Sequence, residues 1–512
     1  MANTFRTRAT RRSGGSGRLS NRGPSGGTTA VLPLPFGIGL ITGGVCVTLS
    51  AAVGLLGDAQ SVGDLRIAEL ILGFTAILIG FTFTRAQGDQ AITRAAAMSM
   101  FVAGWAGMNL VAIIAFWLSG ELGSPLDAVF EAVSASTTTG FTTVADPSQL
   151  SYSLRFLRVV MPWATGLGVL FVSVGVLPTA IAGAELLAQR QLRGRRQLVS
   201  SVGAGLRNIV MLYLLLTALL AIAFWVAGMG LFDGLAYALS TASTGGMANH
   251  VESIGFFDSA AIEWIASAGM VAAGGNLLVV WWAIRGRFDS VWRSTELRLY
   301  AVLLIGGFVV VRFGGSGLGY SDSAVAISSA LSTTGLRSAN WAAGSEIVRA
   351  TILVACGIGA MSGSAGSGFR QARVARVALE TRRSLERLLS PHRESIIKID
   401  GVSLKESSLA LTHGYLWMHA FTLSAVALLL HVREFDLIAT LSFALNAVSN
   451  VGYFVDGTEL SSYVQLSGWS EVIASFGMLL GRLSIYPVLL TIAGLGRWLN
   501  RLRPHRSTGA LR

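Results

Sequence analysis

Long apolar runs alternate with short polar connections over most of the chain. Ten of these runs are long, at residues 33–57, 66–85, 97–119, 156–184, 206–230, 258–284, 297–313, 347–369, 412–431 and 467–496. A helix needs about 20 apolar residues to cross roughly 30 Å of hydrocarbon, and most of the runs reach that length. The pattern therefore predicts ten transmembrane helices.

Four shorter apolar runs lie between the long ones, near residues 126–139, 233–244, 322–334 and 436–450. At about 1.5 Å per residue, a helix of this length reaches only about half way across the membrane. Backbone that stops at that depth is tolerated only where protein shields it or where it lines a wet cavity. We therefore predict four half-helices that enter and leave the membrane on one side.

Each short run ends in a string of small residues closed by glycine. The strings are Ser136–Gly140, Thr241–Gly245, Leu331–Gly335 and Val448–Gly452, and their closing glycines are 105, 90 and 117 residues apart. Glycine permits the backbone angles and the close approach that such a loop needs. Loops of this kind can present carbonyl oxygens to a dehydrated cation. The strings favour four filter loops around one axis over the alternative of ordinary surface turns.

The predicted fold is an all-α polytopic membrane protein. Four quasi-repeats of helix, pore half-helix, filter loop and helix surround one pore, after two additional N-terminal helices. The predicted boundaries are a disordered basic cytoplasmic tail (1–30), two transmembrane helices (31–90), repeat 1 (91–200), repeat 2 (201–295), repeat 3 (296–400) and repeat 4 with a cytoplasmic C-terminus (401–512).

The composition and the charge pattern agree with this architecture. The chain is 52% hydrophobic and 13% charged, with a formal net charge of +12, which is typical of a polytopic membrane protein and not of a soluble enzyme. Arginines cluster at residues 6–22, 190–196, 285–293, 370–393 and 497–506, and with ten spans every cluster falls on the side of the N-terminus. The positive-inside rule predicts a multi-pass protein of the plasma (inner) membrane with both termini cytoplasmic. The expected contact is membrane lipid and not nucleic acid.

An aspartate stands at or near the start of each short run. These residues are Asp127, Asp233, Asp322 and Asp436. Aspartate is a good N-cap and complements the positive end of a helix. The opposite, partly negative ends would then face the strings and favour a cation there. The alternative is that each aspartate simply marks a loop at the membrane surface.

Five further segments resemble one family of transporters in the order in which they occur. They are SPLDAVFEAVSASTTTGFTTV (124–144), WATGLGVLFVSVGVLP (163–178), IEWIASAGMVAAGGN (262–276), GAMSGSAGSGFR (359–370) and MLLGRLSIYP (478–487). Interleaved with the four strings, they make the chain similar to the Trk/Ktr/HKT superfamily of K⁺ transporters, and most similar to the TrkH-type membrane subunit. The resemblance covers residues from about 66 to about 495.

The resemblance implies K⁺ uptake through one pore per subunit, with a homodimer and a separate cytoplasmic nucleotide-binding regulatory ring as partners. It implies K⁺ as the transported ion and no organic cofactor in this chain. The implied ion-binding residues are Thr138, Thr139, Gly140, Thr244, Gly245, Thr334, Gly335, Val451 and Gly452. Because Gly246 follows Gly245 directly, the register of the second string stays open by one residue.

A segment rich in glycine and serine, residues 357–369, interrupts the eighth apolar run. Each glycine costs a helix about 1 kcal/mol, so we expect this span to break. The family places a movable gating loop here and a pore-facing arginine in the last span. The implied gating residues are Gly359, Gly363, Gly366, Gly368 and Arg482. The alternatives are close helix packing by small residues and an arginine that snorkels to the interface.

Four other residues bear on the pore. Glu131 lies within the first half-helix and is expected to hydrogen-bond the filter backbone or to meet water at the outer mouth. Arg337 lies two residues beyond Gly335, where it either opposes cation entry or pairs with Asp456 or Asp146. Met247 and Ser484 depart from the aromatic and acidic residues that the family pattern leads us to expect.

Two other functions are weighed against K⁺ uptake. A Na⁺-permeable or Na⁺/K⁺ cotransporting relative would have the same fold. In the family that the chain resembles, serine in place of the first filter glycine goes with Na⁺ selectivity, so the resemblance implies K⁺ for a chain in which all four positions can be read as glycine. A polytopic membrane enzyme would need clustered acid, base or ligand residues, whereas the six histidines are scattered along the chain. The chain is therefore expected not to be an enzyme.

Overall fold

The computed structural model describes residues 33–58, 63–85, 94–171, 195–286, 288–390, 398–399, 402–403, 406–431, 436–483 and 485–502. The predicted N-terminal tail, Ser484 and the last ten residues lie outside the described residues. Most of the described chain is helical, and the two small sheets each contain two short strands. The predicted all-α fold is confirmed.

Apart from the four short helices described below, the first helices along the chain are α1 (Pro33–Gly57), α2 (Gly63–Arg85), α3 (Arg94–Leu118), α5 (Tyr152–Phe171), α8 (Arg195–Val226) and α10 (Ala260–Gly274). They are followed by α11 (Leu277–Ile284), α12 (Phe288–Trp292), α13 (Thr295–Phe313), α15 (Glu346–Ile358), α16 (Gln371–Leu389), α17 (Glu406–His431), α19 (Gly468–Leu483) and α20 (Ile485–Leu502). The strands are β1 (Lys398–Ile399) with β2 (Val402–Ser403) and β3 (Phe454–Asp456) with β4 (Glu459–Ser461), both pairs antiparallel.

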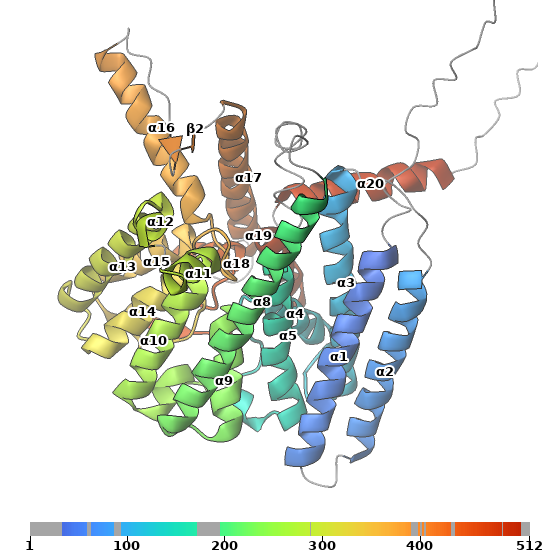
Figure 1. Ribbon diagram of the computed structural model, residues 1–512. Coiled ribbons are helices and arrows are strands. Elements are labelled where there is room, and N and C mark those ends of the chain that lie inside the picture. The colour runs from blue at the N-terminus through green and yellow to red at the C-terminus, as the bar shows by residue number, and fades with distance from the viewer. Residues whose placement is uncertain are drawn as a thin grey trace, which may run out of the picture.

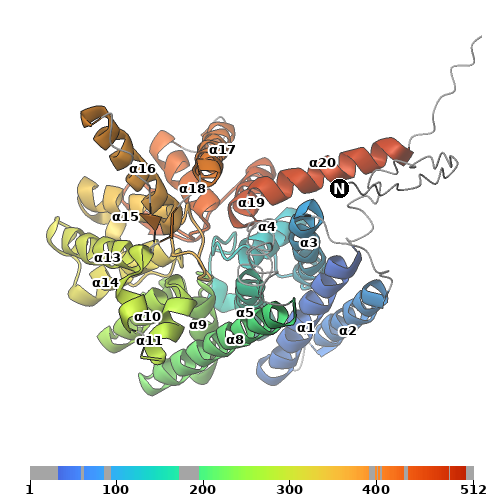
Figure 2. The same cartoon turned by 45° about the horizontal axis from the view of Figure 1, so that its top comes forward.

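The four short apolar runs form the predicted half-helices. They are α4 (Pro125–Ser136), α9 (Leu231–Ser243), α14 (Tyr320–Ser332) and α18 (Leu437–Ser449), each of 12 or 13 residues. Their C-terminal halves are buried almost completely. In Figure 2 the repeats follow one another around a common centre, with the α1–α2 hairpin outside the circle.

Three of the ten predicted spans are broken. The predicted run 258–284 divides into α10 and α11, because the Gly274 carbonyl accepts the Met361 N–H and Gly274 packs against Ser332, where a side chain would not fit. The predicted run 467–496 divides into α19 and α20, which are bent by 107°. The predicted run 347–369 is helical only to Ile358.

Among the described residues, six helices are long and apolar enough to cross a membrane, or up to seven if the bent pair is one span. The halves of a broken helix are each too short to be counted as a membrane span by length, so the number of ten spans stays a prediction. Helices α16 and α20 and the start of α8, which carry or adjoin arginine clusters, lie at the same upper end of the molecule in Figure 1. Their position agrees with the same-side pattern expected from the charges.

The accessory hairpin α1–α2 packs through glycine. A Cβ added to Gly37 would lie 2.6 Å from the Gly80 carbonyl oxygen, and one added to Gly44 would lie 2.6 Å from that of Gly73. Small residues let two helices in a membrane approach this closely, and dispersion between the backbones then stabilises the pair.

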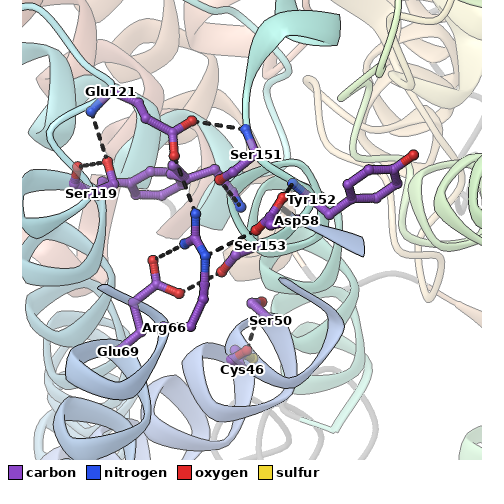
Figure 3. Close-up of polar contacts among 12 residues, drawn as sticks. Cys46, Ser50, Asp58, Arg66, Glu69, Ser119, Glu121, Ser151, Tyr152 and Ser153 are labelled. Carbon is purple, nitrogen blue, oxygen red and sulfur yellow. Dashed lines mark hydrogen bonds and ion pairs between the residues drawn. The ribbon is translucent and has the colours of Figure 1, made fainter. Parts of the chain in front are cut away.

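A buried ion cluster fastens this hairpin to α5 (Figure 3). The Arg66 guanidinium, 1% exposed, binds Asp58 at 2.9 Å and Glu69 at 2.5 Å, and Glu121 lies at 3.5 Å. The same carboxylates accept the Tyr152 N–H, the Ser153 hydroxyl and the Ser151 N–H at the start of α5. Negative charge at a helix N-terminus is favourable, so the cluster holds α5 by its first turn.

Arg66→Gln is expected to destabilise the protein by about 3–5 kcal/mol, because it leaves the buried carboxylates of Asp58 and Glu69 without their counter-charge. Thermal unfolding of the purified protein in detergent measures the effect. The matched control is Arg382→Gln, since Arg382 pairs with Glu386 on an exposed face of α16. Loss of that pair should cost less than about 1 kcal/mol. An equal shift in both variants would contradict the importance of the buried cluster.

Candidate functional site

Four equivalent loops follow the four half-helices, and the backbone fixes their register. In each loop one N–H reaches back five residues to a helix carbonyl. The pairs are Thr139 to Ser134, Gly245 to Ser240, Thr334 to Ser329 and Val451 to Asn446, at 2.7–2.9 Å. The residue before each of these donors has a left-handed conformation, with φ of 55° at Thr138, 54° at Thr244, 59° at Thr333 and 58° at Asn450.

This register makes Gly246, and not Gly245, the equivalent of Gly140, Gly335 and Gly452. Gly245 instead matches Thr139, so the register that the sequence left open between Gly245 and Gly246 is that of Gly246. The N-cap residue lies 16 positions before the glycine in every repeat (Ser124 and Gly140, Gly230 and Gly246, Gly319 and Gly335, Asp436 and Gly452). We call residues 137–140, 243–246, 332–335 and 449–452 central loops 1 to 4.

The four glycines close a ring. A Cβ added to Gly140 would lie 3.0 Å from Gly246, and one added to Gly246 would overlap the Thr334 carbonyl oxygen. One added to Gly335 would lie 2.6 Å from the Gly452 nitrogen, and one added to Gly452 would lie 2.8 Å from the carbonyl carbon of Gly140. Each loop therefore touches both of its neighbours, and no side chain fits between them.

The half-helices before loops 1 and 4 each hold the residue that follows the loop through a side-chain hydrogen bond. The Ser134 hydroxyl donates to the Phe141 carbonyl at 2.6 Å, and the Asn446 amide donates to the equivalent Tyr453 carbonyl at 2.7 Å. Hydroxyl pairs lie inside loops 1 and 3, Thr137 with Thr139 at 2.7 Å and Ser332 with Thr334 at 2.6 Å. The corresponding positions of loops 2 and 4 carry Gly245 and Val451, so the ring has alternating chemistry.

Side chains and backbone also connect neighbouring loops. The Asn450 amide donates to the Thr139 hydroxyl at 3.0 Å, and the Tyr453 hydroxyl donates to the Leu336 carbonyl at 2.9 Å. Beyond loop 1, Thr142 exchanges backbone hydrogen bonds with Ser462 and Val464 of repeat 4. These contacts restrict how far the loops can move apart.

The predicted N-cap role of the aspartates is wrong for three of the four. Asp127, Asp233 and Asp322 lie in the first helical turn, three residues inside the caps, and only Asp436 occupies a cap position. Two of them fasten the chain beyond the central loop instead. Asp233 accepts the Asn249 amide at 2.9 Å and contacts His250, and Asp322 accepts the Ser338 hydroxyl at 2.7 Å.

Glu131 binds the segment that follows loop 1. Its carboxylate, fully buried, accepts the Thr143 N–H at 2.8 Å and the Thr142 hydroxyl. Glu131 therefore bonds backbone at Thr143, three residues beyond the string, and not within the filter string as expected, while burial of the carboxylate excludes the alternative of contact with water at the mouth.

Arg337 does not make the predicted ion pairs. Its guanidinium donates to the Val251 carbonyl and lies 3.5 Å from the Ser462 hydroxyl. Asp146 is held by Ser148 and Gln149, whose hydrogen bonds keep the pKa of this carboxyl below its usual range. Arg337, 9% exposed, therefore connects repeat 3 to repeats 2 and 4 through neutral acceptors.

The Gly/Ser-rich segment breaks the span, as predicted, and lies against central loop 3. Gly359, Gly363 and Gly368 have positive φ values of 73°, 82° and 82°. A Cβ added to Gly366 would lie 2.6 Å from the Ser332 carbonyl oxygen. The Ser367 N–H donates to the Thr333 hydroxyl at 2.8 Å, so the segment is bonded directly to the loop.

Arg482 of α19 holds the same segment from the other side. Its Nη1 donates to the Ala365 carbonyl and to the Ser367 hydroxyl, both at 2.8 Å. The residue is 5% exposed, which contradicts the snorkelling alternative. A continuous path of hydrogen bonds therefore runs from Arg482 through Ser367 to Thr333 of central loop 3.

Comparisons with known proteins find one matching family and several relatives in sequence and structure. The model of the TrkH family, described as a cation transport protein, matches residues 67–314 and 317–495. The Trk system potassium uptake protein TrkG of Escherichia coli (strain K12) is 26% identical over 424 residues, covering 80% of this chain and 87% of that protein. The Trk system potassium uptake protein TrkH of Halomonas elongata is 28% identical over 406 residues, covering 75% and 82%. The crystal structure of the potassium transporter TrkH from Vibrio parahaemolyticus matches with a TM-score of 0.80 at 23% identity, covering 90% of this chain and 98% of that one.

Proposed function

The chain belongs to the TrkH family of cation transport proteins, and from this premise we propose that it takes up K⁺ across the plasma membrane. The protein is an integral membrane transporter and not an enzyme. The potassium uptake proteins TrkG and TrkH, which match most of its length, support the choice of ion. The observation that carries the proposal is the closed ring of four central loops in one register.

In the proposed mechanism the four central loops are the selectivity filter. Carbonyl oxygens of residues such as Thr138, Thr139 and their counterparts replace part of the hydration shell of K⁺. The C-terminal ends of the four half-helices adjoin the ring and carry partial negative charge, which favours a cation there. Glycine closes all four loops, so backbone and not side chains sets the width of the passage.

We assign gating to residues 357–369 together with Arg482. The segment is bonded to both Arg482 and the filter, so its displacement would change both contacts at once. The positive charge of Arg482 opposes a cation that passes, and movement of the segment would relocate that charge. A homodimer and a separate cytoplasmic nucleotide-binding ring are the proposed partners, with both termini in the cytoplasm.

Gly140→Ser tests the choice of ion. Gly140 has a φ of +88° and an added Cβ would lie 3.0 Å from the Gly245 carbonyl oxygen, so serine should distort the first loop. The ratio of Rb⁺ to Na⁺ flux in proteoliposomes is expected to fall about fivefold, the effect of roughly 1 kcal/mol.

The matched control is Gly306→Ser, because Gly306 lies exposed on α13 and an added Cβ meets nothing within 4 Å. Its flux ratio should equal that of the wild type. Equal wild-type fluxes of Rb⁺ and Na⁺ would favour the Na⁺-permeable alternative, and absence of both fluxes would refute the transport proposal itself.

A further inference from the structure

A buried ion pair lies directly behind central loop 1. Arg158 of α5 and Glu131 of α4 join through Nε and Oε2 at 3.1 Å, and their side chains are 3% and 0% exposed. A buried pair is retained only when its remaining hydrogen-bonding atoms are also satisfied, because desolvation otherwise exceeds the attraction. The atoms that satisfy this pair belong to the chain leaving the filter.

Glu131 binds the chain segment that follows central loop 1. The Thr142 hydroxyl and the Thr143 N–H, two and three residues beyond Gly140, both donate to Oε1. With Oε1 used by the loop and Oε2 by Arg158, the carboxylate can take up only one orientation. Arg158 therefore determines where Glu131 holds Thr142 and Thr143, and with them the end of central loop 1.

Arg158 also reaches the second repeat. Its Nη1 lies 3.4 Å from the carbonyl oxygen of Ala248, two residues beyond Gly246. A guanidinium presents its donors in a rigid planar fork, so one side chain fixes both partners relative to each other. Lysine has a single flexible point of charge and cannot do so.

We infer that Arg158 is a positioning residue for ion selectivity. Through Glu131 it fixes the segment that follows central loop 1, and through Ala248 it fixes the spacing between central loops 1 and 2. The inference rests on the proposed function, since it assumes that these loops select the ion. The planar shape of the Arg158 guanidinium, and not its charge alone, keeps the filter at the width of K⁺.

Arg158→Lys is the discriminating variant, because it keeps the charge and loses the fork. We expect the ratio of Rb⁺ to Na⁺ flux in proteoliposomes of the full chain to fall about tenfold, which corresponds to about 1.4 kcal/mol. Thr142→Val removes the hydroxyl that donates to Glu131 and accepts the Val144 N–H, and it keeps the volume of the side chain and the Thr143 N–H bond to Glu131, so the ratio should fall less, by about threefold. If the Arg158→Lys protein does not fold, the flux ratio of the Thr142→Val protein tests whether the Glu131 contact positions the filter.

Arg66→Lys is the matched control. Arg66 is another buried arginine with carboxylate partners, but its ion pairs lie in the accessory hairpin cluster and not at the loops. It should lower the melting temperature without changing the flux ratio. A folded Arg158→Lys protein with the wild-type ratio would overturn the inference, and so would an equal fall in the Arg66→Lys protein. A wild-type protein that carries neither ion would instead refute the proposed function.

Discussion

Gly246→Ala is expected to lower Rb⁺ uptake at least about 100-fold, an effect of about 2.7 kcal/mol on the barrier. Gly246 has a φ of +68°, which any residue with a Cβ adopts at a cost, and its Cβ would overlap the Thr334 carbonyl oxygen of the neighbouring loop. Because both groups belong to fully buried backbone, neither can turn away, and the ring must open. Uptake by cells that lack other K⁺ uptake systems measures the loss.

Gly245→Ala is the comparison that tests the register. Gly245 is not among the residues of positive φ, and an added Cβ would meet side-chain atoms, Pro162 at 2.8 Å and the Ser243 hydroxyl at 2.9 Å. The hydroxyl can rotate and the proline can shift slightly, so uptake should fall by about tenfold or less. A more severe loss in Gly245→Ala than in Gly246→Ala would show that the second loop is in the other register.

The half-helices could be predicted from the sequence because two simple signals coincide there. An apolar run too short to span is followed by a string whose small residues and glycine cannot continue a helix. The register of the second string cannot be read from the string itself, because Gly245 and Gly246 are adjacent. A further signal was present, since Asp127, Asp233 and Asp322 each lie 13 residues before the ring glycine only when Gly246 is chosen.

The break between α10 and α11, the bend between α19 and α20 and the Arg158 pair could not be predicted from hydropathy, whereas the glycines of residues 357–369 did predict the third break. An average over the run containing Gly274 and Asn276 stays apolar, while the break depends on a hydrogen bond from Met361, far along the chain. Arg158 lies near the start of an apolar run, where an arginine ordinarily marks the membrane interface. Its burial follows from the position of Glu131 on another helix, which is information that only the tertiary structure contains.

Arg482→Gln is expected to raise cation flux about 10- to 20-fold in the absence of any regulator. At an assumed separation of roughly 10 Å and an effective dielectric constant of about 20, one positive charge opposes a monovalent cation by about 1.7 kcal/mol. Glutamine removes this charge and can still donate one hydrogen bond to the Ala365 carbonyl, so the segment 357–369 keeps one contact with α19. Rb⁺ flux into proteoliposomes, normalised to the amount of folded protein, measures the change.

Arg482→Lys separates the charge from the contacts, since it keeps the charge and changes the hydrogen bonds, and its flux should stay within about twofold of the wild type. Burial of a charge is costly, and Nε and Nη2 of Arg482 have no hydrogen-bond partner among the described residues. Neutralising Arg482 should therefore leave stability unchanged or raise it, so a gain in flux cannot be attributed to partial unfolding. A fall in flux in a well-folded Arg482→Gln protein would mean that the arginine supports the open pathway and is not a barrier within it.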